Sequence, residues 1–129
     1  MKKTTVTRQG LAPQSISAPV FVVLHTPDGR FRLGDRLPLL RSQIIGREPG
    51  SRGTEIDDEA VSRRHVKITW HGDHGLTELD DLDSKNGTFV NGLQVQRRYL
   101  EPGDIVRVGD SIFAVRQEPK QQQPEAAGD

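Results

Sequence analysis

The stretch DSKNGTFVNG, residues 83–92, contains two Asn-Gly pairs that are separated only by Thr88, Phe89 and Val90. Asn-Gly is the strongest short-range signal for a two-residue β-turn, because both residues readily adopt a positive φ. Thr, Phe and Val favour extended backbone. The stretch therefore predicts a turn, a short strand and a second turn, which is typical of a fold made of many short strands.

The same pattern of short strands continues on both sides of this stretch. Val66, Ile68 and Trp70 alternate with polar residues, so one face of that strand is expected to be buried. Three more apolar runs that are bounded by turn-forming residues are 21–24, 105–108 and 112–115. Many short strands at close spacing indicate an all-β fold, either a sandwich or a barrel.

Residues 57–68, DDEAVSRRHVKI, form the one segment that competes as a helix. Its acidic start and basic middle suit the helix dipole. Its apolar residues do not follow a helical period, because the second half alternates toward Trp70 and the first half offers only Ala60 and Val61. Loops and a strand are therefore favoured over a helix in this segment.

The composition bounds the classes of function. The chain has 129 residues, enough for one domain, and eighteen Lys and Arg balance eighteen Asp and Glu, so no overall field attracts nucleic acid or an anionic membrane. Cysteine is absent, which excludes disulfides and thiolate metal sites and agrees with a cytoplasmic location. The longest apolar run, Val20 to Leu24, is far too short to span a bilayer.

Both ends of the chain differ in composition from its middle. Residues 1–18 are rich in Thr, Ser, Gln and Lys, and residues 118–129 are rich in Gln, Pro, Glu and Ala. Such segments bury too little apolar surface to offset the entropy of ordering them. We therefore expect flexible tails at 1–18 and 118–129 and one folded domain at 19–117.

Three polar clusters lie where the predicted strands end. They are IIGRE with Gly46 and Arg47, VSRRH with Ser62 and His65, and the stretch 83–92. Loops at one end of a sandwich form a shared surface. Together the clusters supply an arginine, a hydroxyl, further cations, a carboxamide and backbone amides, which is a set of donors suited to an oxyanion such as phosphate.

Each cluster taken alone also has a simpler interpretation. A Gly-Arg or Arg-Arg pair is commonly solvated surface, and an Asn-Gly pair is commonly only a turn. Ser62 and His65 could suggest a nucleophile and its base, but their spacing at a strand end would place them on opposite faces, so we expect no enzyme. Three histidines near Asp73 could suggest a metal site, but HGDH at 71–74 is typical of a hairpin turn, so we expect no metal or cofactor.

Taken jointly, four segments resemble the forkhead-associated (FHA) domain, a module that recognises phosphothreonine. They are IIGR at 44–47, IDDEAVSRRH at 56–65, LDDLDSKNGTFVNG at 79–92 and LEPGDIVRVGD at 100–110, in the order of the family. The resemblance implies a β-sandwich of about eleven mostly antiparallel strands. The turns and alternations described above agree with that architecture.

The resemblance also implies which residues would contact a phosphopeptide. Arg47 matches the arginine that grips the phosphate, and its planar guanidinium suits two hydrogen bonds to one oxyanion. Ser62 matches the hydroxyl that donates to a phosphate oxygen. Arg63 matches the residue that follows it, which in relatives contacts the phosphate through its backbone or side chain. Lys85 sits at a phosphate-contacting loop position, and Asn86 matches the asparagine that bonds the peptide main chain.

Other matched residues are implied to support the site without contacting the ligand. His65 matches a histidine that braces its loop by hydrogen bonds, and Asn91 looks architectural. The matched backbone positions are Gly46, Gly87 and Gly92.

Two residues depart from the family pattern. Asp83 stands where relatives often have Gly, and Lys85 stands where well-studied relatives carry Ser or Thr. The Asp83 carboxylate is expected close to Lys85, where it could either orient the ammonium group or weaken its attraction for phosphate.

The function implied by these matches is non-catalytic binding of phosphothreonine-containing proteins downstream of a Ser/Thr protein kinase. One alternative is a phosphate-independent interaction domain that binds through a sheet face. Nucleic-acid binding through the Arg pairs at 63–64 and 97–98 is disfavoured by the zero net charge and the low aromatic content of 5%.

The biological setting stays open between two kinds of bacterial protein. The chain resembles stand-alone FHA adaptors, and its C-terminal composition is similar to the linker that follows the N-terminal FHA domain of sigma-54-dependent transcription regulators. Thr4, Thr5 and Thr7 could be kinase targets whose phosphorylated form folds back into the site.

Overall fold

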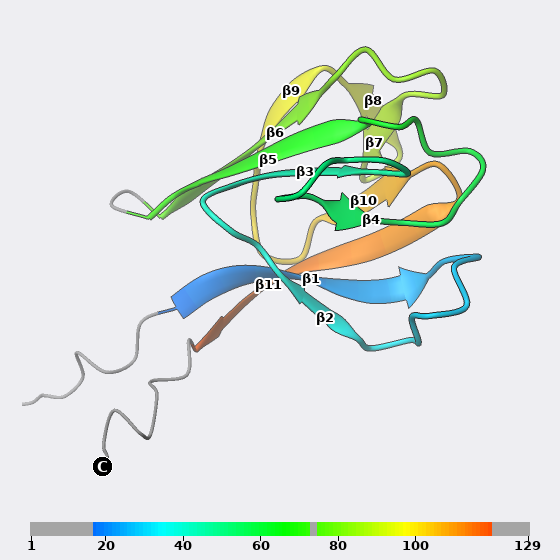
Figure 1. The fold of residues 1–129 in the computed structure, drawn as a ribbon. Coiled ribbons are helices and arrows are strands. Elements are labelled where there is room, and N and C mark those ends of the chain that lie inside the picture. The colour runs from blue at the N-terminus through cyan, green and yellow to red at the C-terminus, as the bar shows by residue number, and fades with distance from the viewer. Residues whose placement is uncertain (1–16, 73–74, 120–129) are drawn as a thin grey trace, which may run out of the picture.

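The structure is a computed structural model that describes residues 17–72 and 75–119 (Figure 1). Within these residues, all the strands belong to two β-sheets that are joined by loops. The eleven strands confirm the predicted all-β sandwich, and residues 57–65 form turns rather than a helix. The strands are β1 Ser17–His25, β2 Arg36–Pro38, β3 Ser42–Gly46, β4 Thr54–Glu55, β5 Val66–His71, β6 Leu76–Asp81, β7 Thr88–Val90, β8 Leu93–Val95, β9 Arg97–Leu100, β10 Ile105–Val108 and β11 Ser111–Pro119. Thr4, Thr5 and Thr7 lie outside the described residues.

The two sheets divide the strands unequally. One has six strands in the order β2-β1-β11-β10-β7-β8, and the other has five in the order β4-β3-β5-β6-β9. Every pair for which a register is given is antiparallel except β3 with β4. Figure 1 shows the sheets as two stacked layers, with β5 and β6 in one and β1 and β11 in the other.

The core lies between the sheets and comes from the alternation of the strands. In β5 the side chains of Val66 and Ile68 are fully buried while Lys67 is exposed, as the period of two predicts. Phe21 of the six-stranded sheet stacks on Phe113 of the same sheet, with ring centroids 5.3 Å apart. Burial of this apolar surface is the main stabilising contribution to the sandwich.

The longest pairing joins the two ends of the domain. β1 and β11 run antiparallel, and their register reaches Ser17 opposite Pro119 and Ala18 opposite Glu118. The paired backbone thus extends two residues beyond the predicted domain limits of 19 and 117 at each end. The prediction used apolar side chains, whereas a strand ladder is held by backbone N–H and C=O groups that any residue except proline supplies in full.

The fold brings three loops to one end of the sandwich. They are the loop after β3 that starts at Arg47, the β4–β5 loop at 56–65, and the β6–β7 loop at 82–87. In Figure 1, β3 ends and the β4–β5 loop turns at the right-hand end and the β6–β7 loop lies at the upper right, whereas β5 ends and β6 begins at the opposite, left-hand end. The three polar clusters of the sequence therefore share one surface.

Candidate functional site

A small open hollow, about 110 Å³ in volume, lies at this end of the sandwich. We call it the loop-end hollow, and its lining residues are Arg47, Glu59, Ala60, Val61, Ser62, Lys85 and Asn86. Four of the five residues matched to phosphopeptide contacts are therefore brought together from three separate loops. Within the described residues, neither Arg47 nor Lys85 takes part in an ion pair, so both positive charges are available to an anion.

Arg47 is held at its base by the neighbouring loop. Its backbone N–H donates to Ser62 O at 3.0 Å, and its side-chain Nε donates to Val61 O. These bonds fix the stem of the side chain and leave the two terminal nitrogens of the guanidinium without a protein partner among the described residues. A guanidinium anchored in this way loses less conformational entropy when it binds an oxyanion.

The Ser62 hydroxyl links two loops and keeps its proton for a ligand. The backbone N–H of Lys85 donates to Ser62 Oγ at 3.0 Å. Because the oxygen accepts this bond, the hydroxyl hydrogen remains able to donate to an anion. Asn86 is placed in a similar way, since its Nδ2 donates to Ala60 O at 2.9 Å and its exposed Oδ1 stays able to accept.

His65 clamps the two loops together from below the hollow. The fully buried ring accepts from the Ser62 backbone N–H at Nδ1, 3.0 Å away, and donates from Nε2 to Gly87 O at 2.9 Å. Because the Gly87 carbonyl can only accept, Nε2 must carry a proton, and because the Ser62 N–H can only donate, Nδ1 must carry none, so the ring is neutral. Burial lowers the pKa of His65, which also favours the neutral form.

The same bonds correct the geometric reason given above for separating Ser62 from His65. Residues 62–65 form a loop rather than a strand end, and the imidazole folds back onto the Ser62 backbone instead of pointing to the opposite face. Both ring nitrogens are occupied by backbone groups, so neither can take a proton from the Ser62 hydroxyl.

Asp81 organises the β6–β7 loop, a role that the sequence analysis missed. Its carboxylate accepts from the Ser84 backbone N–H, the Ser84 hydroxyl and the Thr88 hydroxyl, and Ser84 Oγ in turn accepts from Gly87 N–H at 2.9 Å. Burial raises the pKa of Asp81, but the Ser84 and Thr88 bonds outweigh it and hold the pKa below its usual value. The Asp-x-x-Ser spacing, which suits such a local bond, was the available signal.

Asp58 plays the matching role in the β4–β5 loop. Its buried carboxylate accepts from Ala60 N–H at 2.9 Å, Asp110 N–H at 2.9 Å and the Ser111 hydroxyl at 2.7 Å. It therefore ties the loop that carries Ser62 to the β10–β11 turn. The support of the hollow comes from the buried carboxylate of Asp58 and the partly buried one of Asp81 as well as from His65.

Two matched glycines have clear steric reasons. A Cβ on Gly46 would lie 2.0 Å from Arg63 O, so only glycine lets the β4–β5 loop pass this close to β3. Gly87 has a φ of 84°, which glycine adopts without strain. Asp83 has a φ of 59°, a backbone conformation that glycine adopts more easily than other residues. Within the described residues, no ion pair joins Asp83 to Lys85.

Two of the matched residues lie outside the hollow. The Arg63 side chain is 73% exposed and points toward Glu48, with Nε 3.9 Å from the carboxylate. Asn91 holds the β7–β8 turn to the start of β10, since its Nδ2 donates to Asp104 at 3.0 Å and its Oδ1 accepts from Ile105 N–H at 2.9 Å.

The other chemistries considered from the sequence find little support in the described residues. Residues 17–72 and 75–119 contain no group of three or more His, Cys, Asp and Glu that could hold a metal, while Asp73 and His74 lie outside them. Arg97 contacts Glu78 at 3.0 Å and Asp80 at 2.7 Å, so its charge is already paired. In the same part of the chain no helix is long and apolar enough to cross a membrane.

Comparison with known proteins points to one family. Residues 44–109 match the model of the FHA domain. The chain is 42% identical over 102 residues to the FHA domain-containing protein FhaA of Mycobacterium tuberculosis, and 41% identical over 64 residues to the glycogen accumulation regulator GarA of Mycolicibacterium smegmatis. These matches cover 78% and 50% of this chain, but only 18% of FhaA and 39% of GarA.

Solved structures agree with the sequence comparison. One, from a study of phosphothreonine-dependent FHA domain interactions, is 36% identical with a TM-score of 0.66, over 80% of this chain and 99% of that chain. Another, the FhaA FHA domain complexed with the intracellular domain of Rv3910, is 37% identical with a TM-score of 0.64, over 77% of this chain and all of that chain.

Proposed function

Because this chain belongs to the forkhead-associated (FHA) domain family, we propose that the loop-end hollow binds phosphothreonine in partner proteins without catalysing a reaction. The observation that supports this most directly is the meeting of Arg47, Ser62, Lys85 and Asn86 in one hollow. Two cations that form no ion pair with any described residue, a free hydroxyl proton and an exposed amide suit a phosphorylated peptide. Similar solved domains have been studied for phosphothreonine-dependent interactions.

We assign each residue the role that its placement allows. The terminal nitrogens of Arg47, the Lys85 ammonium group and the Ser62 hydroxyl donate to the phosphate oxygens, since a phosphate ester carries three acceptor oxygens and nearly two negative charges. Asn86 accepts from a peptide N–H and can donate its second Nδ2 hydrogen to a peptide carbonyl. Arg63 contributes through its charge once it turns from Glu48 toward the phosphate.

The kinase context belongs to the same proposal. A Ser/Thr protein kinase supplies the phosphothreonine, so the partner is a substrate of that kinase, and the encounter takes place in the cytoplasm where ATP is available. His65 cannot act as the proton acceptor of a catalytic alternative, because its ring nitrogens are committed to Ser62 and Gly87.

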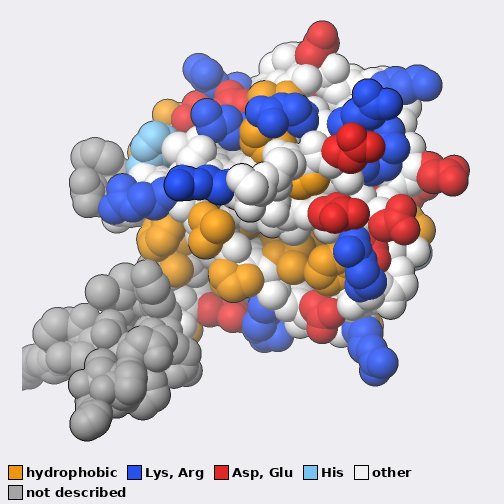
Figure 2. Space-filling view, in the orientation of Figure 1, with side chains coloured by type: hydrophobic (Ala, Val, Ile, Leu, Met, Phe, Trp, Pro, Cys, Tyr) orange, Lys and Arg blue, Asp and Glu red, His pale blue; other side chains and the backbone are white. Residues whose placement is uncertain are grey.

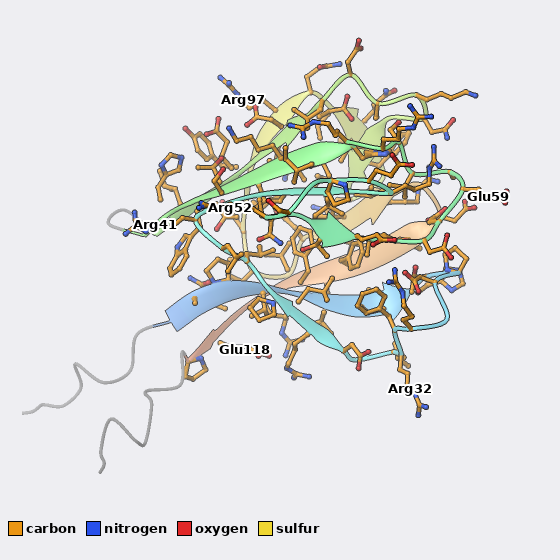
Figure 3. The ribbon with its side chains drawn as sticks, viewed as in Figure 1. Arg32, Arg41, Arg52, Glu59, Arg97 and Glu118 are labelled. Atoms are coloured by element: carbon orange, nitrogen blue, oxygen red, sulfur yellow. The ribbon has the colours of Figure 1, made fainter. Side chains whose placement is uncertain are left out.

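The direct test is a titration with matched peptides that contain Thr or phosphothreonine. We expect only the phosphorylated members of a random-flank peptide library to bind. Arg47→Ala should weaken their binding by about 2–5 kcal/mol, because the phosphate loses its main charged donor. Arg32→Ala is the matched control, since Arg32 is exposed and lies on a different part of the surface, as Figure 3 shows. Equal binding of both peptide forms, or unchanged binding by Arg47→Ala, would contradict the proposal.

A further inference from the structure

One carboxylate shares the loop-end hollow with the groups assigned to phosphate. Glu59 lies on the wall of the hollow beside Ala60 and Ser62, and it is the only acidic residue among those that line it. Its side chain is exposed and projects from the β4–β5 loop at the end of the molecule (Figure 3). A negative charge is out of place in a hollow built for an anion.

The fold makes no use of this carboxylate. Within residues 17–72 and 75–119, the Glu59 side chain takes part in no ion pair and accepts no hydrogen bond, whereas its neighbour Asp58 holds the loop together. Arg47 and Lys85 line the same hollow, but within the described residues neither forms an ion pair with Glu59, and Arg63 faces Glu48 instead. Glu59 therefore keeps its charge for whatever enters the hollow.

A bound phosphate makes that charge consequential. Phosphothreonine brings close to two negative charges onto the same wall, and Glu59 then faces a like charge. An acidic peptide residue beside the phosphothreonine would add a second repulsion. A lysine or arginine side chain at that position would instead lie between two anions and be attracted to both.

We propose that Glu59 is a specificity-determining residue that makes this domain select phosphothreonine peptides with a lysine or arginine within three residues of the phosphorylated residue. The inference rests on the proposed function, since it concerns the same hollow. Figure 2 shows that acidic and basic side chains are interspersed at this end of the molecule, so the selection is local to Glu59 and does not follow from an overall field.

The test scans arginine and glutamate through every position within three residues of phosphothreonine in an otherwise neutral peptide. At one or more positions we expect the arginine peptide to bind about two- to fivefold more tightly than the glutamate peptide, as is typical of an exposed charge pair. Glu59→Gln should abolish this preference, and Glu59→Lys should reverse it. The preference should also shrink at high salt, because exposed charges are screened.

Glu101→Gln is the matched control. It removes the same charge from an exposed residue that precedes β10. The hollow lies near the other end of β10, because Gly109, which follows that strand, packs against Val61 in the wall of the hollow. The control should keep the arginine preference.

The outcomes separate the two proposals. If neutral phosphothreonine peptides bind but no arginine preference exists, or if Glu59→Gln keeps it, Glu59 selects nothing and the proposed function stands. If Glu59→Gln strengthens every phosphopeptide equally, Glu59 only repels phosphate and the inference is overturned. If no phosphothreonine peptide binds at all, the proposed function itself fails.

Discussion

Asn86 and Asn91 each precede a glycine, yet their side chains have different partners in the structure. Asn91 has a φ of 52°, and both polar atoms of its side-chain amide are hydrogen-bonded, Nδ2 to the Asp104 carboxylate and Oδ1 to the Ile105 N–H. Asn86 makes one exposed bond, to Ala60 O, and faces the loop-end hollow. The first Asn-Gly is thus a turn with a free functional group, and the second is a turn that also fastens two strands.

Substitution of each asparagine by alanine should separate these two roles. Asn86→Ala should weaken phosphopeptide binding by about 1–3 kcal/mol, because up to two peptide hydrogen bonds are lost, and change the free energy of unfolding by less than about 1 kcal/mol. Asn91→Ala should lower the free energy of unfolding by about 2–3 kcal/mol, because it removes two bonds and places alanine at a positive φ.

The measurement pairs a peptide titration with denaturant unfolding of the same two proteins. Each variant serves as the control for the other, because the two changes remove the same chemical group from the same dipeptide. Loss of stability in Asn86→Ala without loss of binding would show that Asn86 is only a turn residue.

At the scale of elements, the meeting of β3 with the β4–β5 loop determines the geometry of the hollow. Arg47 N–H and Glu48 N–H donate to Ser62 O and Arg63 O, and Gly46 leaves the room that this contact needs. The loop that carries Ser62 is therefore registered against the strand that carries Arg47 by backbone bonds. Any side chain at position 46 would push the two apart.

Gly46→Ala should therefore damage stability and binding together. The added Cβ would meet Arg63 O at 2.0 Å, so the loop must move, and we expect the free energy of unfolding to fall by about 2–3 kcal/mol. Gly29→Ala is the matched control, because an added Cβ there would have no atom within 4 Å, and it should change stability by less than about 1 kcal/mol. Equal stabilities of the two variants in urea unfolding would contradict this account.

The elements show why the strands could be predicted and the support of the site only in part. Period-two alternation and turn residues mark local structure, so β5, β10 and their turns follow from the sequence. Asp58 and Asp81 bond to backbone groups, and the partners of Asp58 lie as far away as Ser111. The Asp-x-x-Ser spacing marks the local bonds of Asp81, but nothing in the one-dimensional pattern shows that the Asp58 carboxylate is buried and accepts bonds from the distant Asp110 and Ser111.

The residues of the hollow were identifiable for a related reason. Arg47, Ser62, Lys85 and Asn86 each stand where a strand pattern stops, and a sandwich gathers such positions at its ends. Arg63 is different, because its orientation depends on an exposed neighbour, Glu48, and not on the fold. Glu59 gave no signal, since one acid among three in a loop marks nothing until the neighbouring loops are in place.

Across the whole molecule, the hollow and the pair formed by Ser17 and Pro119 lie at opposite ends of the sandwich. β11 starts at Ser111 beside the turn that Asp58 holds, and ends at Pro119 opposite Ser17. Nine residues of strand span about 30 Å. Figure 1 shows β1 beginning and β11 ending away from the three loops. The open end of the β1–β11 ladder is therefore remote from the hollow.

Two buried groups, His65 and Asp28, and the partly buried Asp81 make the stability of this molecule depend on pH. Burial lowers the pKa of His65. The pKa of Asp28 is held well below its usual range, chiefly by the Arg30 guanidinium and also by backbone N–H groups of Asp57 and Arg30, although burial opposes the shift. The pKa of Asp81 is also lowered, because the hydrogen bonds from Ser84 and Thr88 outweigh the opposing effect of burial. Each group thus binds protons less readily in the folded than in the unfolded state.

The sign of the effect is the same for all three groups, but the pH windows differ. A lowered folded pKa means that the unfolded state takes up protons first, so stability is lost as pH falls. For His65 the loss begins near its unfolded pKa of 6.5, and for the two aspartates near 3.8. The free energy of unfolding should therefore decline in two steps, one below about pH 6.5 and a second below about pH 4.

Urea unfolding from pH 7.5 down to pH 3 should show both steps. His65→Gln should be less stable than the unaltered protein at pH 7.5, but it should lose the upper step, because glutamine does not titrate. His25→Gln is the control, and it should keep the upper step because His25 is exposed. If His65→Gln does not fold, NMR titration of the His65 ring in the unaltered protein gives the same answer. A ring that titrates at or above pH 6.5, or an upper step that survives in His65→Gln, would show that the clamp between the two loops does not depend on a neutral histidine.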